Sequence, residues 1–235
     1  MNLKSQMKPV FAQPLSYITL SIITAISISP LVLAAPEKAP EQSAEKFACR
    51  EILSNKEPKQ IQKLAQFSDT DSPERSQMIQ QANALYNQGE LAGAADNLCR
   101  FIKKFPQDAF GHFQLGNVFF RQTKPEAAVS AYQEAIRLKP EYALAYNAIG
   151  AVYASQSRWD DAITEYQKAL KINPNYGDAL INLGEAQWQT NKKAEAQASL
   201  ERALNIFKSQ SRNEKVYRVE QILRQMKKGN DPSIS

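Results

Sequence analysis

Histidine occurs only once among the 235 residues, and cysteine only twice. A single histidine excludes histidine-rich metal centres and leaves most acid–base and nucleophilic mechanisms without their usual base. Glycine is also scarce, with eight residues, and the chain has no glycine-rich phosphate loop, no GxSxG and no HExxH motif. We therefore predict that the protein is not an enzyme and that it has no cofactor and no metal site.

The excess of charge of one sign is also small. The formal net charge is +5 at pH 7, and Lys4 and Lys8 supply two of these units, so residues 36–235 carry only +3. Such a weakly basic chain does not support nucleic-acid binding. With 43% hydrophobic and 23% charged residues, the composition is that of an ordinary globular protein.

One long hydrophobic run is present, at residues 15–35, and it contains no charged residue. It follows the basic start formed by Lys4 and Lys8 and ends in small residues, which is the pattern of a secretory signal peptide. Val32 and Ala34 stand at positions −3 and −1 for a cut after Ala34, and a cut after Ala35 is the neighbouring choice. We therefore predict that residues 1–35 direct export to the periplasm or an equivalent lumen.

Two other interpretations of residues 15–35 stay open. About 20 residues suffice to cross a bilayer, so the run also fits a retained membrane anchor, although its serines and threonines dilute its hydrophobicity. A buried core helix is the third interpretation. Residues 36–46 are rich in Ala, Pro, Glu and Lys, and we expect a flexible spacer there.

The rest of the chain repeats itself at intervals of 34 residues. Five sets of residues share this spacing: Pro106, Pro140 and Pro174; Ala82, Gly116, Gly150 and Gly184; Ala94, Ala128, Ala162 and Ala196; Leu98, Tyr132, Tyr166 and Leu200; and Phe101, Ala135, Ala169 and Ala203. Each block holds two amphipathic helical stretches, about 141–155 and 159–172 in the third block. A helix pair cannot bury its apolar face alone, so the copies stack. The spacing predicts an all-α solenoid of stacked antiparallel helix pairs.

The repeated residues have physical roles. A small residue lets a neighbouring helix approach to about 8–10 Å, so we expect Gly150 on a first helix to meet Ala162 on the second. Each proline ends a second helix, because proline cannot continue one.

These repeats resemble the tetratricopeptide repeat, whose motif has Leu-Gly, aromatic, Ala, aromatic, Ala and Pro at fixed positions. The matching residues of the two inner blocks are Leu115, Gly116, Phe119, Ala128, Tyr132, Ala135 and Pro140 in 109–142, and Tyr146, Ile149, Gly150, Tyr153, Ala162, Tyr166, Ala169 and Pro174 in 143–176. The outer blocks, 75–108 and 177–210, match less well: Gln81 and Ala82 replace Leu-Gly in the first, and Gln187 and Lys208 replace Tyr and Pro in the last. The resemblance implies a right-handed superhelix that acts as a binding scaffold.

Segments on both sides of residues 75–210 are expected to cap the array. Residues 47–74 carry Phe47, Ile52, Leu53, Ile61, Leu64 and Phe67 and end in Ser72-Pro73-Glu74, a typical helix start. Residues 211–229 form a predicted terminal helix whose apolar face holds Val216, Val219, Ile222, Leu223 and Met226. Its other face is basic, which fits a solvated surface or, alternatively, contact with anionic lipid. Residues 230–235 are a tail.

The one histidine and a pair of acids have structural interpretations. His112 stands where the resembling family often has Trp or Tyr, which places it in the core. Asp160 and Asp161 open a helix, where acids interact favourably with the positive end of the helix dipole.

Cys49 and Cys99 are disulfide candidates, because an even number of cysteines outside the cytoplasm favours pairing. Cys99 follows the packing position Leu98, where the inner blocks have Gln133 and Gln167, so we expect it near the surface. A bridge closing about 50 residues would contribute about 4 kcal/mol in the chain-entropy model. Two buried free thiols are the alternative.

The resemblance also implies a concave groove lined by the first helix of each pair. Carried over from the family, the candidate groove residues are Asn83, Tyr86, Phe110, Phe113, Asn117, Phe120, Arg121, Asn147 and Trp188, with Ile79, Leu144, Ala151, Asp178, Ile181 and Glu185 at further positions. Aromatic anchors and amides suit an extended peptide or a partner helix. One subfamily binds acidic chaperone tails through several basic residues, but here Arg121 stands almost alone, and Ile79 and Phe113 replace the expected lysines.

Two functions from different classes follow. The first is a non-enzymatic scaffold outside the cytoplasm that binds a partner protein and assists assembly or stability of an envelope or membrane-protein complex. The second is a carrier or regulatory module that binds a small ligand or a glycan in the aromatic groove. Residues 15–35 add a membrane contact if they are not cleaved. The sequence does not identify the partner or the oligomeric state.

Overall fold

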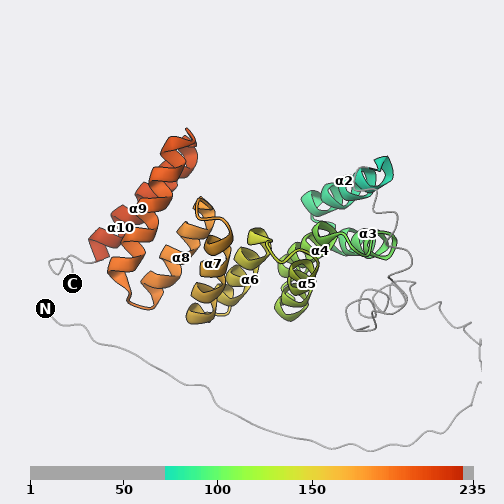
Figure 1. Ribbon diagram of the computed structural model, residues 1–235, viewed down its shortest axis with the longest axis horizontal. Helices are drawn as coiled ribbons and strands as arrows, with labels where there is room; N and C mark the ends of the chain where they lie inside the picture. The colour runs from blue at the N-terminus through green and yellow to red at the C-terminus, as the bar shows by residue number, and fades with distance from the viewer. Residues whose placement is uncertain (1–71, 230–235) are drawn as a thin grey trace, which may run out of the picture. The chain divides into compact units, whose positions relative to one another are not determined.

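The computed structural model describes residues 72–229, and in this part of the chain nine α-helices follow one another (Figure 1). Their bounds are α2 (Pro73–Gln88), α3 (Leu91–Lys104), α4 (Ala109–Arg121), α5 (Pro125–Leu138), α6 (Ala143–Ser155), α7 (Trp159–Ile172), α8 (Gly177–Gln189), α9 (Lys193–Ser209) and α10 (Asn213–Gly229). The predicted signal or anchor, the spacer, the cap as far as residue 71 and the tail lie outside the described residues.

The helices pack as consecutive antiparallel pairs, α2 with α3, α4 with α5, α6 with α7 and α8 with α9, and the second helix of each pair also packs against the first helix of the next. The predicted all-α architecture of stacked helix pairs is therefore confirmed. The third block was expected to hold helices at 141–155 and 159–172. They span Ala143–Ser155 and Trp159–Ile172. The hand of the superhelix stays a prediction.

The glycine of each inner pair lies against an aromatic ring of the second helix. A Cβ atom built on Gly150 would lie 2.5 Å from a ring carbon of Tyr166, and at Gly116 the equivalent neighbour is the ring of Tyr132. The nearest neighbour of Gly150 on the second helix is therefore the ring of Tyr166, which the sequence did not predict, and the expected contact with Ala162 stays a prediction. At Gly184, where Leu200 replaces the ring, the Ala196 carbonyl does come near.

The prolines set the length of the second helices. α3, α5 and α7 each have 14 residues and stop two residues before Pro106, Pro140 and Pro174. Lys208 takes the proline position in the last pair, and α9 runs through it to Ser209 with 17 residues. Since lysine keeps its backbone N–H and does not clash with the preceding turn, the helix continues.

Two side chains cap first helices in the first half of the array. The Ser72 hydroxyl accepts a hydrogen bond from the Arg75 backbone N–H at 3.2 Å, and Pro73 is the first helical residue, which confirms the predicted start of α2. Asp108 caps α4 by accepting from the N–H of Phe110 at 2.8 Å. Its second oxygen accepts from Arg75 Nε at 2.6 Å, so one carboxylate joins α2 to α4.

The turn inside each pair contains a residue with left-handed backbone. Gly89, Thr123, Ser157 and Asn191 recur at intervals of 34, and their φ angles are 84°, 56°, 59° and 60°. Glycine adopts this conformation without strain, whereas other residues incur a cost in backbone strain. The four residue types have little in common, so the sequence did not reveal this position.

The predicted terminal helix is present as α10, which ends at residue 229 as expected but begins at Asn213, two residues later than the predicted segment. Val219 and Met226 are buried against α8 and α9, and Val216, Ile222 and Leu223 are partly buried against the same core. The apolar face assigned from the sequence is therefore the packed face.

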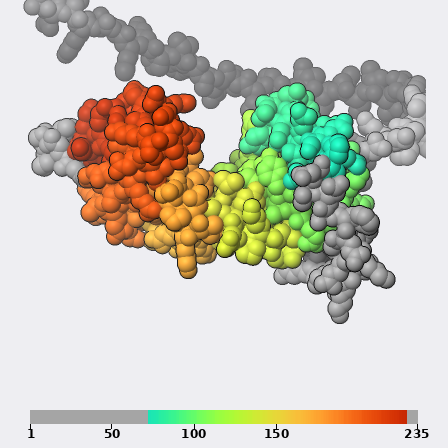
Figure 2. Space-filling model, turned by 45° about the horizontal axis from the view of Figure 1, so that its top comes forward, coloured from blue at the N-terminus to red at the C-terminus, as the bar shows by residue number. Residues whose placement is uncertain are grey.

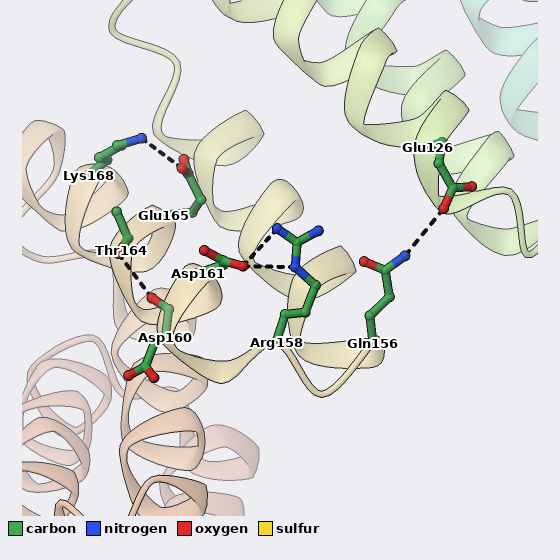
Figure 3. Close-up of polar contacts among 8 residues, drawn as sticks. All are labelled: Glu126, Gln156, Arg158, Asp160, Asp161, Thr164, Glu165 and Lys168. Carbon is green, nitrogen blue, oxygen red and sulfur yellow. Dashed lines mark hydrogen bonds and ion pairs between the residues drawn. The ribbon is translucent and has the colours of Figure 1, made fainter.

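His112 and the two acids also lie where their structural interpretations require. His112 is 4% exposed in α4 and belongs to the interior, as predicted. In the first turn of α7, Asp161 pairs with Arg158 at 2.7 Å (Figure 3), and Asp160 pairs with Lys192 at 3.2 Å. Gln156, in the preceding turn, donates to Glu126 of α5 at 3.5 Å (Figure 3). The Asp161–Arg158 pair is local to the start of α7, whereas the contacts of Asp160 and Gln156 reach the start of α9 and α5.

Candidate functional site

None of the nine residues predicted to line the groove is fully buried, and all lie on first helices of pairs, namely α2, α4, α6 and α8. Five of them are on α4, two are on α2, and α6 and α8 carry one each. Figure 2 shows the surface dipping over α6 (yellow), between the higher ends formed by α2 (cyan) and by α9 and α10 (red). Beside Asn147 on α6, Leu144 is 44% exposed, which is unusual for a large apolar side chain here. We name these nine residues together with Leu144 the candidate face.

One further residue assigned to the groove is not there. Ile181 is 1% exposed and lies in the core between α8 and its neighbours α9 and α10. Its neighbour Asn182 is half-buried instead and takes part in the polar contacts of the first helices. The assignment failed because block four receives α10 as its next neighbour, and α10 covers the position.

The aromatic part of the candidate face is partly structural. The ring of Phe113 lies 5.7 Å from that of Tyr132 and 5.2 Å from that of Tyr142, both of which are buried. The ring of Phe110 lies 6.5 Å from that of Phe113 and is not among the rings that contact Tyr132 and Tyr142. Truncating Phe113 would therefore be expected to lower stability as well as any binding, so Phe110 and Leu144 are the cleaner probes of this face.

Amide side chains form a hydrogen-bonded chain between α2, α4 and α5. Gln114 Nε2 donates to Asn83 at 2.7 Å, and Asn117 Nδ2 donates to Gln114 at 2.8 Å. The Tyr132 hydroxyl in turn donates to Asn117 Oδ1 at 2.9 Å. Burial raises the pKa of Tyr132 above its usual value, so the hydroxyl stays a donor at neutral pH. Gln114 was not among the predicted residues, since nothing in its local sequence distinguishes it from an exposed glutamine.

Arg121 is held by its own chain. Its guanidinium donates to the backbone carbonyl of Tyr86 at 2.5 Å, and its central carbon lies 4.7 Å from the centroid of the Tyr86 ring. A guanidinium has five N–H donors, so this exposed side chain keeps donors for an incoming acceptor. The sequence predicted both residues as groove residues but not their contact.

The second half of the face is built from single contacts rather than a chain. Asn147 accepts from Asn182 Nδ2 at 3.0 Å, which joins α6 to α8. Trp188 is partly buried, and the ammonium of Lys193 lies 5.4 Å from the centroid of its ring. These contacts place one amide and one aromatic side chain at the surface of α6 and α8.

The acids of α8 are paired with basic residues of α10. Lys215 lies 2.7 Å from Asp178, and Arg218 lies 3.9 Å from Glu185. Burial raises the pKa of Glu185, and Arg218 opposes that shift. From the sequence, Asp178 and Glu185 were expected in the groove and the basic residues of α10 at a solvated or lipid-contacting surface, and their mutual contact was not predicted. The α10 helix therefore occupies the position that the first helix of a fifth pair would take.

Three further features of residues 72–229 concern metal-ligand groups, membrane spans and surface depressions. Among residues 72–229, no group of three or more His, Cys, Asp and Glu side chains is arranged to hold a metal ion. No helix in that range has the length and apolar character needed to cross a bilayer. Two shallow depressions lie elsewhere, at 191–195 and beside Arg202, and neither includes a residue of the candidate face.

Cys99 is buried, with 6% of its surface exposed, so the predicted surface position is wrong. It belongs to the core cluster that α3 shares with its neighbours. Its proposed partner, Cys49, lies outside the described residues, so the pairing stays a proposal.

Comparison with known proteins found several likenesses. The chain is similar to two crystal structures of MamA. The first has 26% identity and a TM-score of 0.54, with 61% of this chain and 84% of that chain covered, and the second has 27% identity and a TM-score of 0.52, with 59% and 75% covered. A structure titled as the complex of the TPR2B domain of yeast Sti1 with pHsp70 has 24% identity and a TM-score of 0.50, with 52% of this chain and 98% of that chain covered. Comparison with curated protein sequences found no match.

Models of a protein family match most of the helical array. One tetratricopeptide repeat model matches residues 79–143, and a second matches residues 141–209. Together they cover more than half of the chain, and the matched residues run from α2 to the end of α9. The stacked pairs, their repeated glycine–ring contacts and these matches show that the chain belongs to the tetratricopeptide repeat family.

Proposed function

We propose that the protein is a non-enzymatic scaffold that binds a partner protein, as an extended peptide or a helix, on the candidate face. The observation that carries the proposal is the composition and exposure of this face. Half-buried aromatic rings, an exposed leucine and a set of amides lie together on first helices that stack side by side. Rings and leucine provide apolar anchor area, and amides satisfy the polar groups of a partner backbone.

The amide contacts favour preorganisation of this face. Because Asn83, Gln114 and Asn117 are bonded to one another, their side chains are ordered before a partner arrives. Ordering that is already present in the free protein does not have to be supplied on binding, and affinity rises accordingly. The guanidinium of Arg121, ordered by Tyr86, adds a fixed positive charge beside the amides.

We propose further that the protein acts outside the cytoplasm, where it assists assembly or stability of an envelope or membrane-protein complex. The support is the signal-like pattern of residues 1–35, which is either cleaved or retained as an anchor. An oxidising compartment would also allow Cys49 and Cys99 to pair. A ligand or glycan carrier remains the second candidate, favoured by the aromatic side chains Phe110 and Trp188 on the same face.

Site-specific photocrosslinking tests the proposed binding face. A photoreactive phenylalanine analogue replaces Leu144, which is 44% exposed, and as a control it replaces Gln133, an exposed residue of the second helix α5. After irradiation in the native host, we expect one defined protein crosslinked at position 144 and none at position 133. The purified partner should then bind the wild-type chain, and Phe110→Ser with Leu144→Ser should weaken binding at least 30-fold, as expected when central apolar anchors are removed.

The other outcomes separate the candidates. Glycan crosslinked at position 144 without protein would favour the carrier function. Equal crosslinking of the same protein at 144 and 133 would show that the partner does not select the candidate face.

A further inference from the structure

The helix α3 buries more of its surface than the other second helices do. Cys99 is 6% exposed, although the residues at intervals of 34 from it are all exposed: Gln133, Gln167 and Glu201. The same holds for Ile102, which is 3% exposed, whereas its equivalents are only half-buried: Ile136, Leu170 and Leu204. Together with the buried Ala95, these residues form one side of α3, which we name the α3 flank.

The described neighbours of α3 do not explain this difference. α3 packs against α2 and α4 in the same arrangement in which α5 packs against α4 and α6. In α5 this arrangement leaves Gln133 exposed, so the equivalent neighbours alone should leave Cys99 exposed too. The additional cover of the α3 flank must have another source.

We propose that residues 47–67 of the same chain dock on the α3 flank and that a disulfide between Cys49 and Cys99 closes this contact. The segment enters the fold directly before α2, the partner of α3, so it is close at hand. It contains six large apolar residues, which suit an apolar flank: Phe47, Ile52, Leu53, Ile61, Leu64 and Phe67. It also contains Cys49, which is the only other cysteine of the chain.

The disulfide forms by exchange with a disulfide-bearing oxidant, such as oxidised glutathione. The two cysteine thiols lose two protons and two electrons in total as the Sγ–Sγ bond forms, and the disulfide of the oxidant takes them up and becomes two thiols.

The proposed contact also determines where the cap lies relative to the candidate face. The proposed contact is with a second helix, whereas the candidate face lies on first helices. The inference does not depend on the proposed function.

Thiol counting and hydrogen exchange on the full chain, as produced by its native host, test the proposal. Under denaturing conditions without reductant we expect a monomer with no thiol that can be alkylated, and two thiols after reduction. By hydrogen exchange we expect residues 47–67 to be protected in the oxidised protein.

A substitution on the flank provides the decisive comparison. Ala95→Arg places a long charged side chain at a position that is 8% exposed, and it should speed exchange of residues 47–67 at least tenfold. Ala198→Arg, the same change at an exposed position of α9, is the matched control and should leave that exchange unchanged. Cys49→Ser changes no described helix and should also speed exchange in 47–67 while leaving α5 to α9 unchanged, so the test survives if Ala95→Arg does not fold.

Three results would overturn the proposal. The first is two alkylated thiols in the unreduced chain. The second is a disulfide-linked dimer, in which a second copy supplies the partner cysteine. The third is hydrogen-exchange protection of residues 47–67 that is the same in Cys49→Ser as in the wild type.

Discussion

At the scale of single residues, the buried side chain of His112 makes the stability of the fold depend on pH. Burial lowers the pKa of His112 from its usual value of 6.5, although Glu134 opposes the shift. The unfolded chain therefore binds this proton more tightly than the folded protein does. It follows that the contribution of His112 to stability is fully present above pH 6.5 and is lost as the pH falls below that value.

We predict that the free energy of unfolding decreases between pH 7.5 and pH 5.5, and that His112→Gln removes most of this decrease. Urea denaturation at several pH values measures both curves. Because His112 is the only histidine, the comparison has no second imidazole to correct for. An equally steep decrease in His112→Gln would contradict the assignment.

The glycine–ring contact allows a second prediction at this scale. Gly150→Ala should destabilise the fold by about 1–3 kcal/mol, because the new Cβ would lie 2.5 Å from the Tyr166 ring and must displace it. Gly93→Ala is the matched control. Its Cβ would lie 3.6 Å from Leu85, an ordinary contact, and alanine favours the helix, so this change should stabilise by about 0.5–1 kcal/mol. If Gly150→Ala and Gly93→Ala shift the free energy of unfolding in the same direction in thermal or urea denaturation, the Tyr166 ring does not restrict the side chain at position 150.

At the scale of elements, the turns inside the helix pairs carry a small strain. Ser157 has a φ of 59°, and a left-handed backbone costs a non-glycine residue about 1–2 kcal/mol. Glycine avoids this strain, but it loses more conformational entropy on folding, which offsets part of the gain. We predict that Ser157→Gly stabilises the protein by about 0.5–1 kcal/mol in urea denaturation.

The control for this prediction is Ser130→Gly, the same change at an exposed position inside α5, which should destabilise by about 0.5 kcal/mol. A loss of stability in both variants would mean that the left-handed turn is not strained by serine.

Elements also show how one missing residue changes the architecture. Without a proline at position 208, α9 gains an extra turn relative to α3, α5 and α7, and only three residues separate it from α10. The salt bridges of Lys215 with Asp178 and of Arg218 with Glu185 then place α10 across the end of the array. The last pair is thus closed by a helix of the chain itself.

At the scale of the whole molecule, the predicted export has the widest consequence for function. We predict that the chain isolated from its native host begins at Ala35 or Pro36, because small residues at positions −3 and −1 direct cleavage there. Replacing both Ala34 and Ala35 with Phe should leave the N-terminal segment attached. N-terminal sequencing reads out both cases. A mature chain that starts near Met1 would favour the anchor, and recovery in the cytoplasm would contradict export.

The sequence by itself determined the period, the pairing of helices and most helix ends. These features depend on local chemistry that recurs: apolar residues at helical spacing, a small residue where helices approach, and a proline where a helix must stop. The bounds of α7 and the end of α10 could therefore be predicted from residues close to them in the chain, and the buried position of His112 followed from the resemblance to the repeat motif.

Only the tertiary structure decided which neighbour each side chain meets. The contacts Asn83–Gln114, Asn147–Asn182 and Arg218–Glu185 join residues about one repeat apart, so they depend on the rotation and offset between stacked pairs, which no local pattern records. The same applies to Ile181 and Cys99, because the equivalent positions of the inner repeats are not buried. Each lies near an end of the array, where one neighbour is not a repeat, and burial there is decided by what that neighbour covers.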